Sequence, residues 1–378
     1  MTRRICVEAS PAVQQQAGIG RYALNLIRAL LSAQPDGDYA IGYNLSGSAT
    51  LPEPLGSVPA YTSKLENKSW RLRNAITHFG APPMDSFFDG VELYHSTGHL
   101  LPRLRHIRTV ITLHDLIPLL MPQFHRPLNH LFLRLMLPRF LHRADAIIAV
   151  SENTKKDAVA LLGADPEHIT VIPEGISDNF RPVHDNKQLE ALRAAYGLPH
   201  TFILCVSTIE PRKNHITLLR AFERIHQEYP HVALVLAGRR GWLYHGFLDA
   251  LANSSARHHV RMLGEVPERD LPVLLSAATV FAFPSLYEGF GLPPLEAMAC
   301  STPVVCSNAS SLPEVVGDAA MLCDPTDAIA WRTAITNFLS NEDRRREMES
   351  HGLNRAADFR WDSVARSTRA VYECTLNT

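Results

Sequence analysis

Two carboxylates separated by seven residues form the clearest chemical motif of the sequence. Glu288 and Glu296 lie within the segment Pro284-Ser-Leu-Tyr-Glu-Gly-Phe-Gly-Leu-Pro-Pro-Leu-Glu-Ala-Met298. We expect Glu288 in a loop and Glu296, half buried, in a helix that begins near Pro293 or Pro294, since proline fits the first helical turn. Carboxylates accept hydrogen bonds from paired hydroxyl groups, as a sugar or a ribose presents. The alternative, acidic residues that only favour the helix dipole, explains Glu296 poorly because its neighbours are apolar.

A pair of adjacent cations follows another predicted strand. Arg212 and Lys213 lie in Ser207-Thr-Ile-Glu-Pro-Arg-Lys-Asn214, directly after the apolar run 202–206 and before a helical stretch that begins near His215. Arginine offers a planar fork of donors and lysine a mobile point charge, which together suit the oxygens of a diphosphate. A solvated surface pair is the alternative.

Two glycine-rich segments could present backbone N–H groups to an anion. Gly18 and Gly20 open a helix predicted over Ile19–Leu31. Their G-x-G-x-x-A pattern does not fit a dinucleotide fingerprint, because about eight residues separate it from the preceding strand and no acidic residue ends a second strand near position 40. Gly289 and Gly291 precede a second predicted helix. Phosphates bind at such N-termini, and glycines that only shape a turn are the alternative in both places.

A histidine and an aspartate follow a third predicted strand. His114 and Asp115 come directly after the run Thr109–Leu113. The sequence has no G-x-S-x-G nucleophile elbow, so we expect a polar contact with substrate rather than a nucleophilic role. A capping aspartate beside a packed histidine is the alternative.

Two patterns that could suggest a metal do not support one. Asp36-Gly37-Asp38 has a D-x-D spacing, but it follows Pro35 and precedes a strand, which favours a surface turn. His258-His259 has no third candidate ligand nearby. We therefore expect no metal and no cofactor.

Strands and helices alternate along most of the chain. This pattern predicts parallel sheets with helices on both faces. Helices are expected at Ile19–Leu31, Thr217–Glu228, Leu271–Ala278 and Trp361–Thr375. The expected strands are Ile5–Ala9, Tyr39–Tyr43, Leu93–His95, Thr109–Leu113, Ala146–Val150, Thr170–Ile172, Phe202–Ser207, Ala233–Ala237, Val260–Leu263, Val280–Pro284, Pro303–Ser307 and Ala320–Cys323.

The polar segment 173–200 interrupts this alternation, and we interpret it as the linker between two doubly wound domains. Ligands of open parallel sheets bind outside the carboxyl ends of the strands. The motifs described above follow strands, so we expect them to face a cleft between the two domains.

Composition and charge exclude several classes of protein. With 378 residues, 46% of them hydrophobic, the chain can bury two cores, and its formal net charge of -1 argues against a general nucleic-acid partner. No signal peptide or membrane-spanning run is visible, and none of the six cysteines forms a CxxC pair, which favours a cytoplasmic location.

The charge is nevertheless uneven. Residues 68–143 hold ten Lys/Arg against four acids, and within them Pro127–Arg143 mixes Leu and Phe with Arg and His. Such a stretch could lie on an anionic membrane surface. A helix packed on its own domain is the alternative.

Taken together, these motifs resemble the retaining glycosyltransferases of the GT-B fold in glycosyltransferase family four, and within it a bacterial mannosyltransferase group. The matching stretches are Gly18-Ile-Gly-Arg-Tyr, His114-Asp-Leu-Ile-Pro, Val150-Ser-Glu-Asn-Thr-Lys-Lys-Asp, Glu210-Pro-Arg-Lys-Asn, Glu288-Gly-Phe-Gly-Leu-Pro, Glu296-Ala-Met-Ala-Cys and Ser310-Ser-Leu-Pro-Glu-Val-Val-Gly-Asp-Ala-Ala. One departure is that Ser207-Thr208 stands where many members carry a further arginine.

The resemblance implies a role for each candidate residue. Glu296 would hold the ribose of a nucleotide-sugar donor, Glu288 the transferred sugar, and His114 the sugar near its reacting carbon. Arg212 and Lys213 would bind the diphosphate, and Glu265 and Val266 would lie at the base. The remaining donor-binding candidates are Gly18, Gly20, Gly289, Phe290, Gly291 and Leu292.

The resemblance also implies an architecture and a reaction. Residues 1–180, completed by a last helix within 361–378, would form an acceptor domain, and residues 181–360 a donor domain. The enzyme would move a hexose, by group resemblance mannose from GDP-mannose, to a glycan or lipid-linked acceptor in cell-surface polysaccharide or O-antigen synthesis, with retention and without a metal. A GT-B nucleotide-sugar epimerase and a non-catalytic nucleotide-sugar-binding module remain alternatives.

Overall fold

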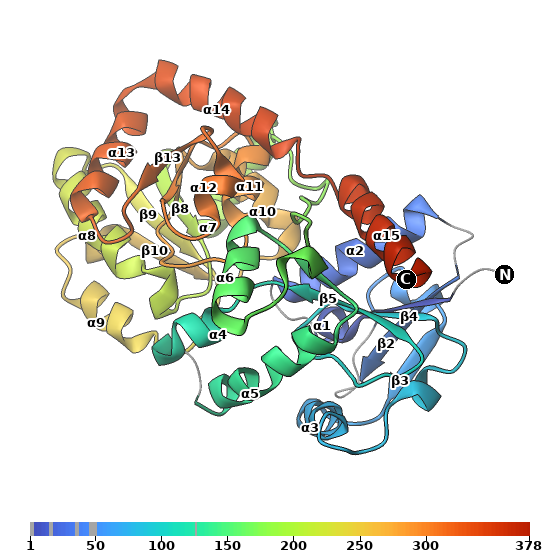
Figure 1. Cartoon of the computed structure of the whole chain (residues 1–378). Helices are drawn as coiled ribbons and strands as arrows, with labels where there is room; N and C mark the ends of the chain where they lie inside the picture. The colour runs from blue at the N-terminus through green and yellow to red at the C-terminus, as the bar shows by residue number, and fades with distance from the viewer. Residues whose placement is uncertain (1–3, 15–17, 35–37, 45–50, 125–126) are drawn as a thin grey trace. The chain divides into compact units, whose positions relative to one another are not determined.

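The computed structural model describes residues 4–14, 18–34, 38–44, 51–124 and 127–378 (Figure 1). The chain folds into two compact units. Unit 1 comprises Met1–Gly175 and Arg360–Thr378, and unit 2 comprises Ile176–Phe359. The sequence analysis placed these boundaries after residues 180 and 360.

The described part of unit 1 is built on a parallel sheet of seven strands in the order β3-β2-β1-β4-β5-β6-β7. Six of these strands were predicted to within one residue at each end. The missed strand, β3, is a short and largely exposed edge strand. The bounds are β1 Ile5–Glu8, β2 Tyr39–Asn44, β3 Ala60–Ser63, β4 Leu93–Ser96, β5 Arg108–Leu113, β6 Ala146–Ala149 and β7 Ile169–Val171.

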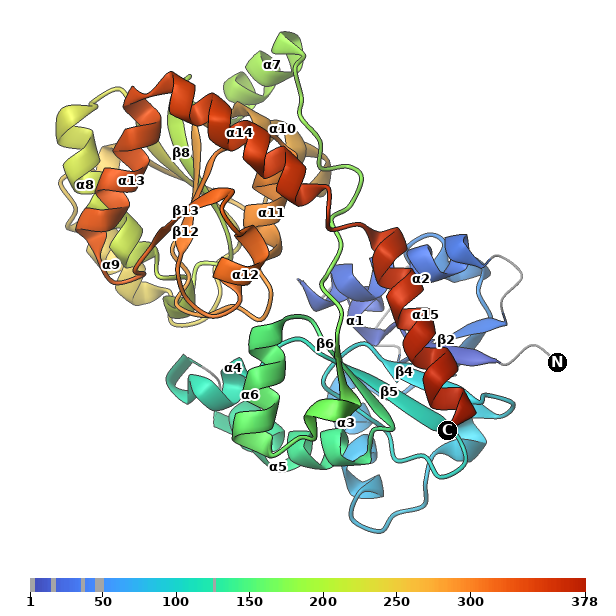
Figure 2. The same cartoon turned by 45° about the horizontal axis from the view of Figure 1, so that its top comes forward.

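Helices cover both faces of this sheet, and each face has its own apolar core. One core contains α2 together with α15, and the other contains α3, α5 and α6. α15, drawn in red, lies along α2 (Figures 1 and 2). The helices are α1 Ser10–Val13, α2 Ile19–Ala33, α3 Asn67–Thr77, α4 Ile117–Leu120, α5 Pro127–Arg143, α6 Glu152–Leu162 and α15 Trp361–Asn377.

A buried polar chain joins the last helix to the sheet. His95 in β4 is fully buried between Tyr372 Oη, 2.6 Å from its Nδ1, and Thr112 Oγ1, 2.8 Å from its Nε2. Burial lowers the pKa of His95 to about 3. A neutral imidazole therefore fixes α15 against the centre of the sheet.

Unit 2, all of whose residues are described, contains a parallel sheet of six strands in the order β10-β9-β8-β11-β12-β13. Its central strands are apolar on both faces, as the continuous hydrophobic runs of the sequence predicted. The bounds are β8 Phe202–Val206, β9 Ala233–Ala237, β10 Val260–Gly264, β11 Val280–Phe283, β12 Val304–Ser307 and β13 Ala320–Cys323.

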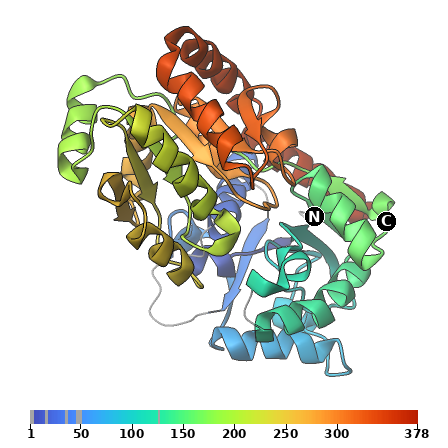
Figure 3. The same cartoon turned by 90° about the vertical axis from the view of Figure 1, so that its left-hand side faces the viewer.

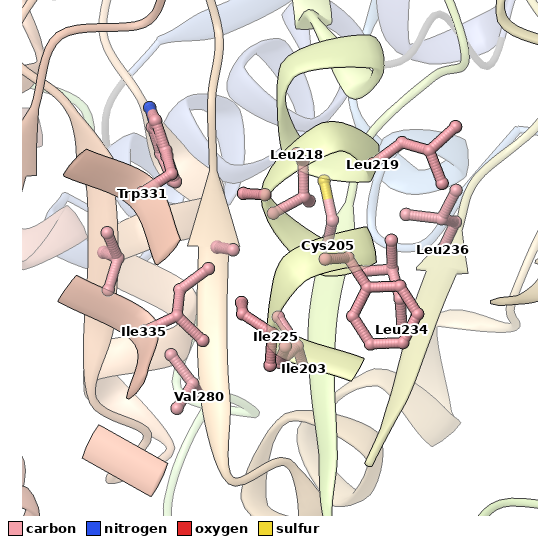
Figure 4. Close-up of a cluster of buried hydrophobic side chains, with 14 of the residues drawn as sticks. Ile203, Cys205, Leu218, Leu219, Ile225, Leu234, Leu236, Val280, Trp331 and Ile335 are labelled. Carbon is pink, nitrogen blue, oxygen red and sulfur yellow. The ribbon is translucent and has the colours of Figure 1, made fainter. Parts of the chain in front are cut away.

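Two layers of helices enclose this sheet (Figure 3). One core joins α8 and α13 to alternate residues of the strands, among them Ile203, Cys205 and Val280, with Trp331 and Ile335 from α13 (Figure 4). The helices are α7 Asn186–Tyr196, α8 His215–Glu228, α9 His245–Ala252, α10 Leu271–Ala277, α11 Leu292–Ala299, α12 Leu312–Val316, α13 Ala328–Ser340 and α14 Glu342–Ala356.

The predicted linker over 173–200 was wrong in one respect, because it contains helix α7. Asp185 caps this helix by accepting a hydrogen bond from Lys187 N at 2.9 Å, and Gly197 ends it with a φ of 61°. Both are ordinary cap residues. Leu192 is the buried residue of α7, so its apolar face was too narrow to be recognised.

The strand orders place the candidate site. In each sheet the chain first builds strands in one direction and then returns to build outward in the other. The reversal lies between β1 and β4 in unit 1 and between β8 and β11 in unit 2. Loops that leave the carboxyl ends of strands at such a reversal are where parallel sheets bind ligands.

Candidate active site

In unit 2 the loops that follow β8 and β11 are bonded directly to one another. Leu286 N donates to Arg212 O at 2.8 Å, and Arg212 Nη1 donates to Tyr287 O at 2.6 Å. The first loop contains the cations predicted to bind a diphosphate and the second contains Glu288. The neighbouring positions of β8 and β11 therefore bring these three predicted residues together.

Three charged side chains meet at this junction, and a fourth extends the cluster. Glu288 accepts from Lys213 Nζ at 2.5 Å and pairs with Arg212 Nη1 at 3.0 Å. Arg212 also pairs with Glu210 Oε1 at 2.9 Å. The Lys213 ammonium lies 5.1 Å from the centre of the Phe283 ring. The two cations are thus held in fixed positions by carboxylates.

Burial makes this cluster strongly coupled. Burial alone would raise the pKa of Glu288, but the charges of Arg212 and Lys213 lower that pKa to about 2. Burial and the neighbouring Arg212 lower the pKa of Lys213, and Glu288 opposes that change. The Glu288 carboxylate therefore favours the charged form of Lys213 in a buried site, where a fixed cation acts strongly on a bound anion.

A third loop supports Glu288. Ser310 Oγ accepts from Glu288 N at 2.8 Å, and Ser311 Oγ donates to Glu288 O at 3.0 Å and to Phe290 O at 2.6 Å. Both serines follow β12, the strand next to β11. The sequence analysis recognised this segment without assigning these residues to the site. Their position after a strand was the signal that could have placed them there.

Helix α11 begins at Leu292, one residue before the predicted start. Its N-cap is Gly291, whose φ of 125° is a conformation that side-chain-bearing residues rarely adopt. Pro293 and Pro294 follow and have no N–H, so the backbone donors at this end come from Gly291 and Leu292. Glu296 is 4% exposed, more deeply buried than the half-buried position that we expected.

The predicted base contact lies on the loop after β10. Glu265 is exposed and Val266 is buried. Gly238 N, after β9, donates to Gly264 O at 2.6 Å. A Cβ on Gly238 would lie 2.0 Å from Ser207 O, so only glycine allows these loops to approach so closely. The loop of Glu265 is thus connected through Gly238 to the loop that holds Arg212.

In unit 1, His114 is buried and both of its ring nitrogens have partners. Nδ1 lies 3.1 Å from Glu174 Oε1, and Nε2 lies 2.9 Å from Thr97 O. Asp115 Oδ1 accepts from Ile117 N, at the first residue of helix α4, at 3.0 Å, and the N-cap of that helix is Leu116. The packed histidine of the alternative weighed for this motif is present, whereas Asp115 is not the N-cap residue of α4. The predicted sugar contact of His114 stays a prediction.

The first glycine-rich loop lies close to this histidine. Gly18, with a φ of 70°, is the N-cap of α2, and Gly20 is within its first turn. Tyr22, one turn into the helix, meets the His114 ring edge-on at 4.6 Å between ring centres. The first turn of α2 therefore lies beside His114 in unit 1.

Among the described residues, no group of three or more His, Cys, Asp or Glu side chains could hold a metal. His258 accepts from Arg257 Nε at 3.1 Å, and the His259 ring lies 3.8 Å from that of His226. Asp36 and Gly37 lie outside the described residues, and Asp38 pairs with Arg4 at 3.0 Å.

Solved structures share this fold along nearly the whole chain. Sucrose-phosphate synthase from Thermosynechococcus elongatus superposes with a TM-score of 0.75 at 22% identity and covers 98% of both chains. Anabaena Alr3699/HepE in complex with UDP-glucose gives 0.73 at 17% identity, over 98% of this chain and 99% of the other. Two doubly wound parallel sheets and this likeness define the class as an α/β protein of GT-B fold, as predicted.

The sequence comparisons narrow this class to a family. The model described as Glycosyltransferase Family 4 matches residues 17–180, and that of Glycosyl transferases group 1 matches residues 190–355. O-antigen chain mannosyltransferase B from Escherichia coli is 30% identical over 386 residues, covering 98% of this chain and 99% of the relative. The chain belongs to glycosyltransferase family 4 and is a glycosyltransferase, which confirms the resemblance seen in the sequence.

Proposed function

We propose that the chain transfers mannose from GDP-mannose to a hydroxyl group of a glycan or lipid-linked acceptor in cell-surface polysaccharide synthesis. The observation that carries the transferase chemistry is the buried cluster of Arg212, Lys213 and Glu288 after β8 and β11. Mannose and O-antigen synthesis are supported by the name of the Escherichia coli relative. The cytoplasm, where nucleotide sugars are substrates, is the proposed location.

The donor would bind to unit 2 through three features. Arg212, Lys213 and the N-terminus of α11 would hold the diphosphate, because all three present positive charge or backbone donors. Glu288 would accept hydrogen bonds from the hexose and Glu296 from the ribose. Glu265 and Val266 would lie at the base. His114 and the start of α2 in unit 1 would supply the remaining contacts.

The proposed reaction retains the configuration of the sugar and uses no metal. The acceptor oxygen forms a bond to the anomeric carbon on the face from which the diphosphate leaves, while the bond from that carbon to the phosphate oxygen breaks. The acceptor proton passes to the departing phosphate. Negative charge grows on that phosphate, so the fixed charges of Arg212 and Lys213 lower the barrier.

A donor panel tests the proposed substrate. Ligand that binds the folded state raises the apparent melting temperature. We expect GDP and GDP-mannose to raise the Tm of the chain, and UDP, ADP and their sugars to raise it less, in a thermal-shift series. A larger shift with UDP- or ADP-sugars would contradict the choice of donor.

The same donors distinguish the two alternative functions. We expect the protein to release GDP from GDP-mannose when a mannan or lipid-linked acceptor is present. Without acceptor, we expect only slow hydrolysis of the donor. NMR spectroscopy of the reaction measures this release. An epimerase would convert a nucleotide sugar without acceptor, and a binding module would leave every donor intact. Either of these outcomes would refute the transferase proposal.

We also propose that unit 1 contacts an anionic membrane through one surface, formed by α3, Phe79 and α5. Arg71 bridges the helices, with Nη2 2.9 Å from Asn129 Oδ1, and they lie near each other in Figure 1. One side of α5 is buried in the core of unit 1, so the packing alternative is also correct. The exposed apolar residues of the surface are Leu72, Ile76, Phe79, Leu128, Leu131 and Leu135.

The same helices also carry exposed basic side chains. Lys68, Arg73, Arg134 and Arg139 are exposed on the same helices. Exposed apolar residues beside clustered cations fit the boundary between lipid headgroups and acyl chains. A lipid-linked acceptor would be met at that boundary. Among the described residues, no helix has the length and apolar character to span a bilayer.

Vesicle co-sedimentation tests this surface. We expect binding to vesicles that contain phosphatidylglycerol, weakening with salt, and at least tenfold weaker binding for the double variant Leu131→Glu/Leu135→Glu, because it places charge among the apolar residues. Leu161→Glu, at an exposed leucine of α6, is the matched control. Failure of the unmodified protein to bind at low salt would refute the proposal.

A further inference from the structure

In unit 1, His114 faces the carboxylate of Glu174, and the proposed donor contacts do not use this pairing. His114 and Glu174 are 5% and 6% exposed, and they face one another at 3.1 Å. Glu174 belonged to none of the sequence motifs. It precedes the boundary of unit 1 at Gly175 by one residue.

The partners of the two ring nitrogens restrict where protons can lie. Thr97 O is a carbonyl and only accepts, so Nε2 of His114 must carry a hydrogen. Nδ1 faces a carboxylate oxygen of Glu174. An ionised carboxylate also only accepts, and the ring then carries both protons and a positive charge.

We propose that Glu174 is a positioning residue that holds His114 as a doubly protonated imidazolium, with its ring plane fixed, for the transfer reaction. The two groups form a buried pair of opposite charge. The Glu174 carboxylate replaces the hydration that the imidazolium loses inside unit 1. This inference rests on the proposed function for its catalytic consequence, but the charge of His114 can be measured independently.

The other groups around His114 act consistently with this pair. Burial alone would lower the pKa of His114, but Glu174, Thr97 O and the charge of Asp115 raise it above its ordinary value. The rings of Tyr22 and His99 lie 4.6 and 6.1 Å away. Tyr22 Oη bonds to Thr112 Oγ1 at 3.1 Å rather than to the imidazole.

His95 is a further neighbour of His114, and its imidazole is neutral. Burial and the charge of His114 lower the pKa of His95, so His95 adds no second positive charge beside His114. Glu174 is consequently the buried anion that faces His114 directly.

The backbone holds Glu174 in place. A Cβ on Gly175 would lie 2.8 Å from ring atoms and the backbone N of Trp361, so this glycine lets the chain pack closely against the start of α15. Trp361 also meets Tyr22 at 5.7 Å between ring centres. Trp361 therefore packs against Gly175, which follows Glu174, and against Tyr22, so it helps to hold two of the residues that contact His114.

Two measurements on the full chain test the proposal. In the pH dependence of kcat/KM, we expect Glu174→Gln to move the alkaline limb at least one pH unit lower, because burial is no longer opposed by a carboxylate. Glu174→Asp keeps the charge, and we expect it to restore part of that shift. Glu167→Gln, an exposed acid of unit 1, should leave the profile unchanged.

Nitrogen-15 NMR of the His114 ring reads the charge without any turnover. We assign the resonance with His114→Asn and expect two protonated ring nitrogens at pH 7 in the unmodified protein. A neutral ring at pH 7 would overturn the proposal even if Glu174→Gln does not fold. An unchanged His114 titration in folded Glu174→Gln would also overturn it. If the protein has no transferase activity, the proposed function is refuted. The NMR measurement would still decide whether Glu174 holds His114 as an imidazolium.

Discussion

Glu288→Gln is expected to lower kcat/KM about 100- to 1,000-fold, equivalent to about 3–4 kcal/mol of transition-state stabilisation. Glutamine has the same shape but no charge. It cannot hold the Lys213 ammonium at 2.5 Å and the Arg212 guanidinium at 3.0 Å as the carboxylate does. Lys213 would then lose the carboxylate that fixes it relative to the departing phosphate, whereas Arg212 keeps its contacts with Glu210 and Tyr287 O. Steady-state kinetics with the best donor measure the effect.

The same substitution is expected to change how stability depends on pH. Glu288 has a pKa near 2, below its ordinary value of 4.5, so its stabilising contribution is present above pH 4.5 and is lost as the pH falls towards 2. The difference corresponds to about 3 kcal/mol. Urea unfolding between pH 7 and pH 3 should show this acid-dependent loss in the unmodified protein and a smaller one in Glu288→Gln.

Glu268→Gln is the matched control, because Glu268 is an exposed acid of the same unit. We expect Glu268→Gln to keep the turnover of the unmodified enzyme and to lose the same amount of stability at low pH. If Glu288→Gln keeps the turnover of the unmodified enzyme, Glu288 is not part of the machinery. If Glu288→Gln loses as much stability between pH 7 and pH 3 as the unmodified chain does, the buried ion pairs do not form in solution.

The sequence was sufficient to predict which strands deliver the chemistry. Arg212, Lys213 and Glu288 each follow a continuous apolar run, and the carboxyl end of a buried parallel strand is where such residues gather. The direct pairing of Glu288 with both cations was not predictable. It depends on β8 and β11 being neighbours, and strand order is set by how the whole sheet assembles.

Residues without a local pattern were missed for a related reason. Glu174 acts through a contact with His114 that spans 60 positions of the chain. Ser310 and Ser311 support Glu288 from a third strand end. A serine or a lone glutamate gives no period and no spacing, so only the folded arrangement shows what it touches.

The fold itself was predictable wherever burial was strong. Strands buried on both faces were found, whereas β3, whose sequence is Ala-Tyr-Thr-Ser and which is largely exposed, was not. Helix α7 had its caps at Asp185 and Gly197 but little apolar face. Elements held mainly by local capping give weak hydrophobic periodicity, and tertiary context decides whether they form.

Lys213→Ala is the second substitution for which a large loss is expected, about 100- to 1,000-fold in kcat. The side chain is 13% exposed and its ammonium bonds to Glu288. Its removal takes away one of the charges proposed to meet the departing phosphate, while Arg212 still pairs with Glu288 at 3.0 Å. We therefore expect the protein to remain folded and the chemical step to slow, as single-turnover kinetics would show.

Chemical rescue separates a catalytic ammonium from a packing effect. Alanine leaves a space beside Glu288 that a small amine can enter, so ethylammonium should restore part of the activity of Lys213→Ala while a neutral alcohol of similar size should not. Lys187→Ala removes an exposed lysine of the same unit and should lose nothing. A full loss without rescue, accompanied by a fall in Tm, would assign Lys213 to structure alone. If Lys213→Ala keeps the turnover of the unmodified enzyme, Lys213 does not stabilise the departing phosphate. Arg212 and the N-terminus of α11 would then provide that stabilisation, since these would be the positive groups left beside the diphosphate.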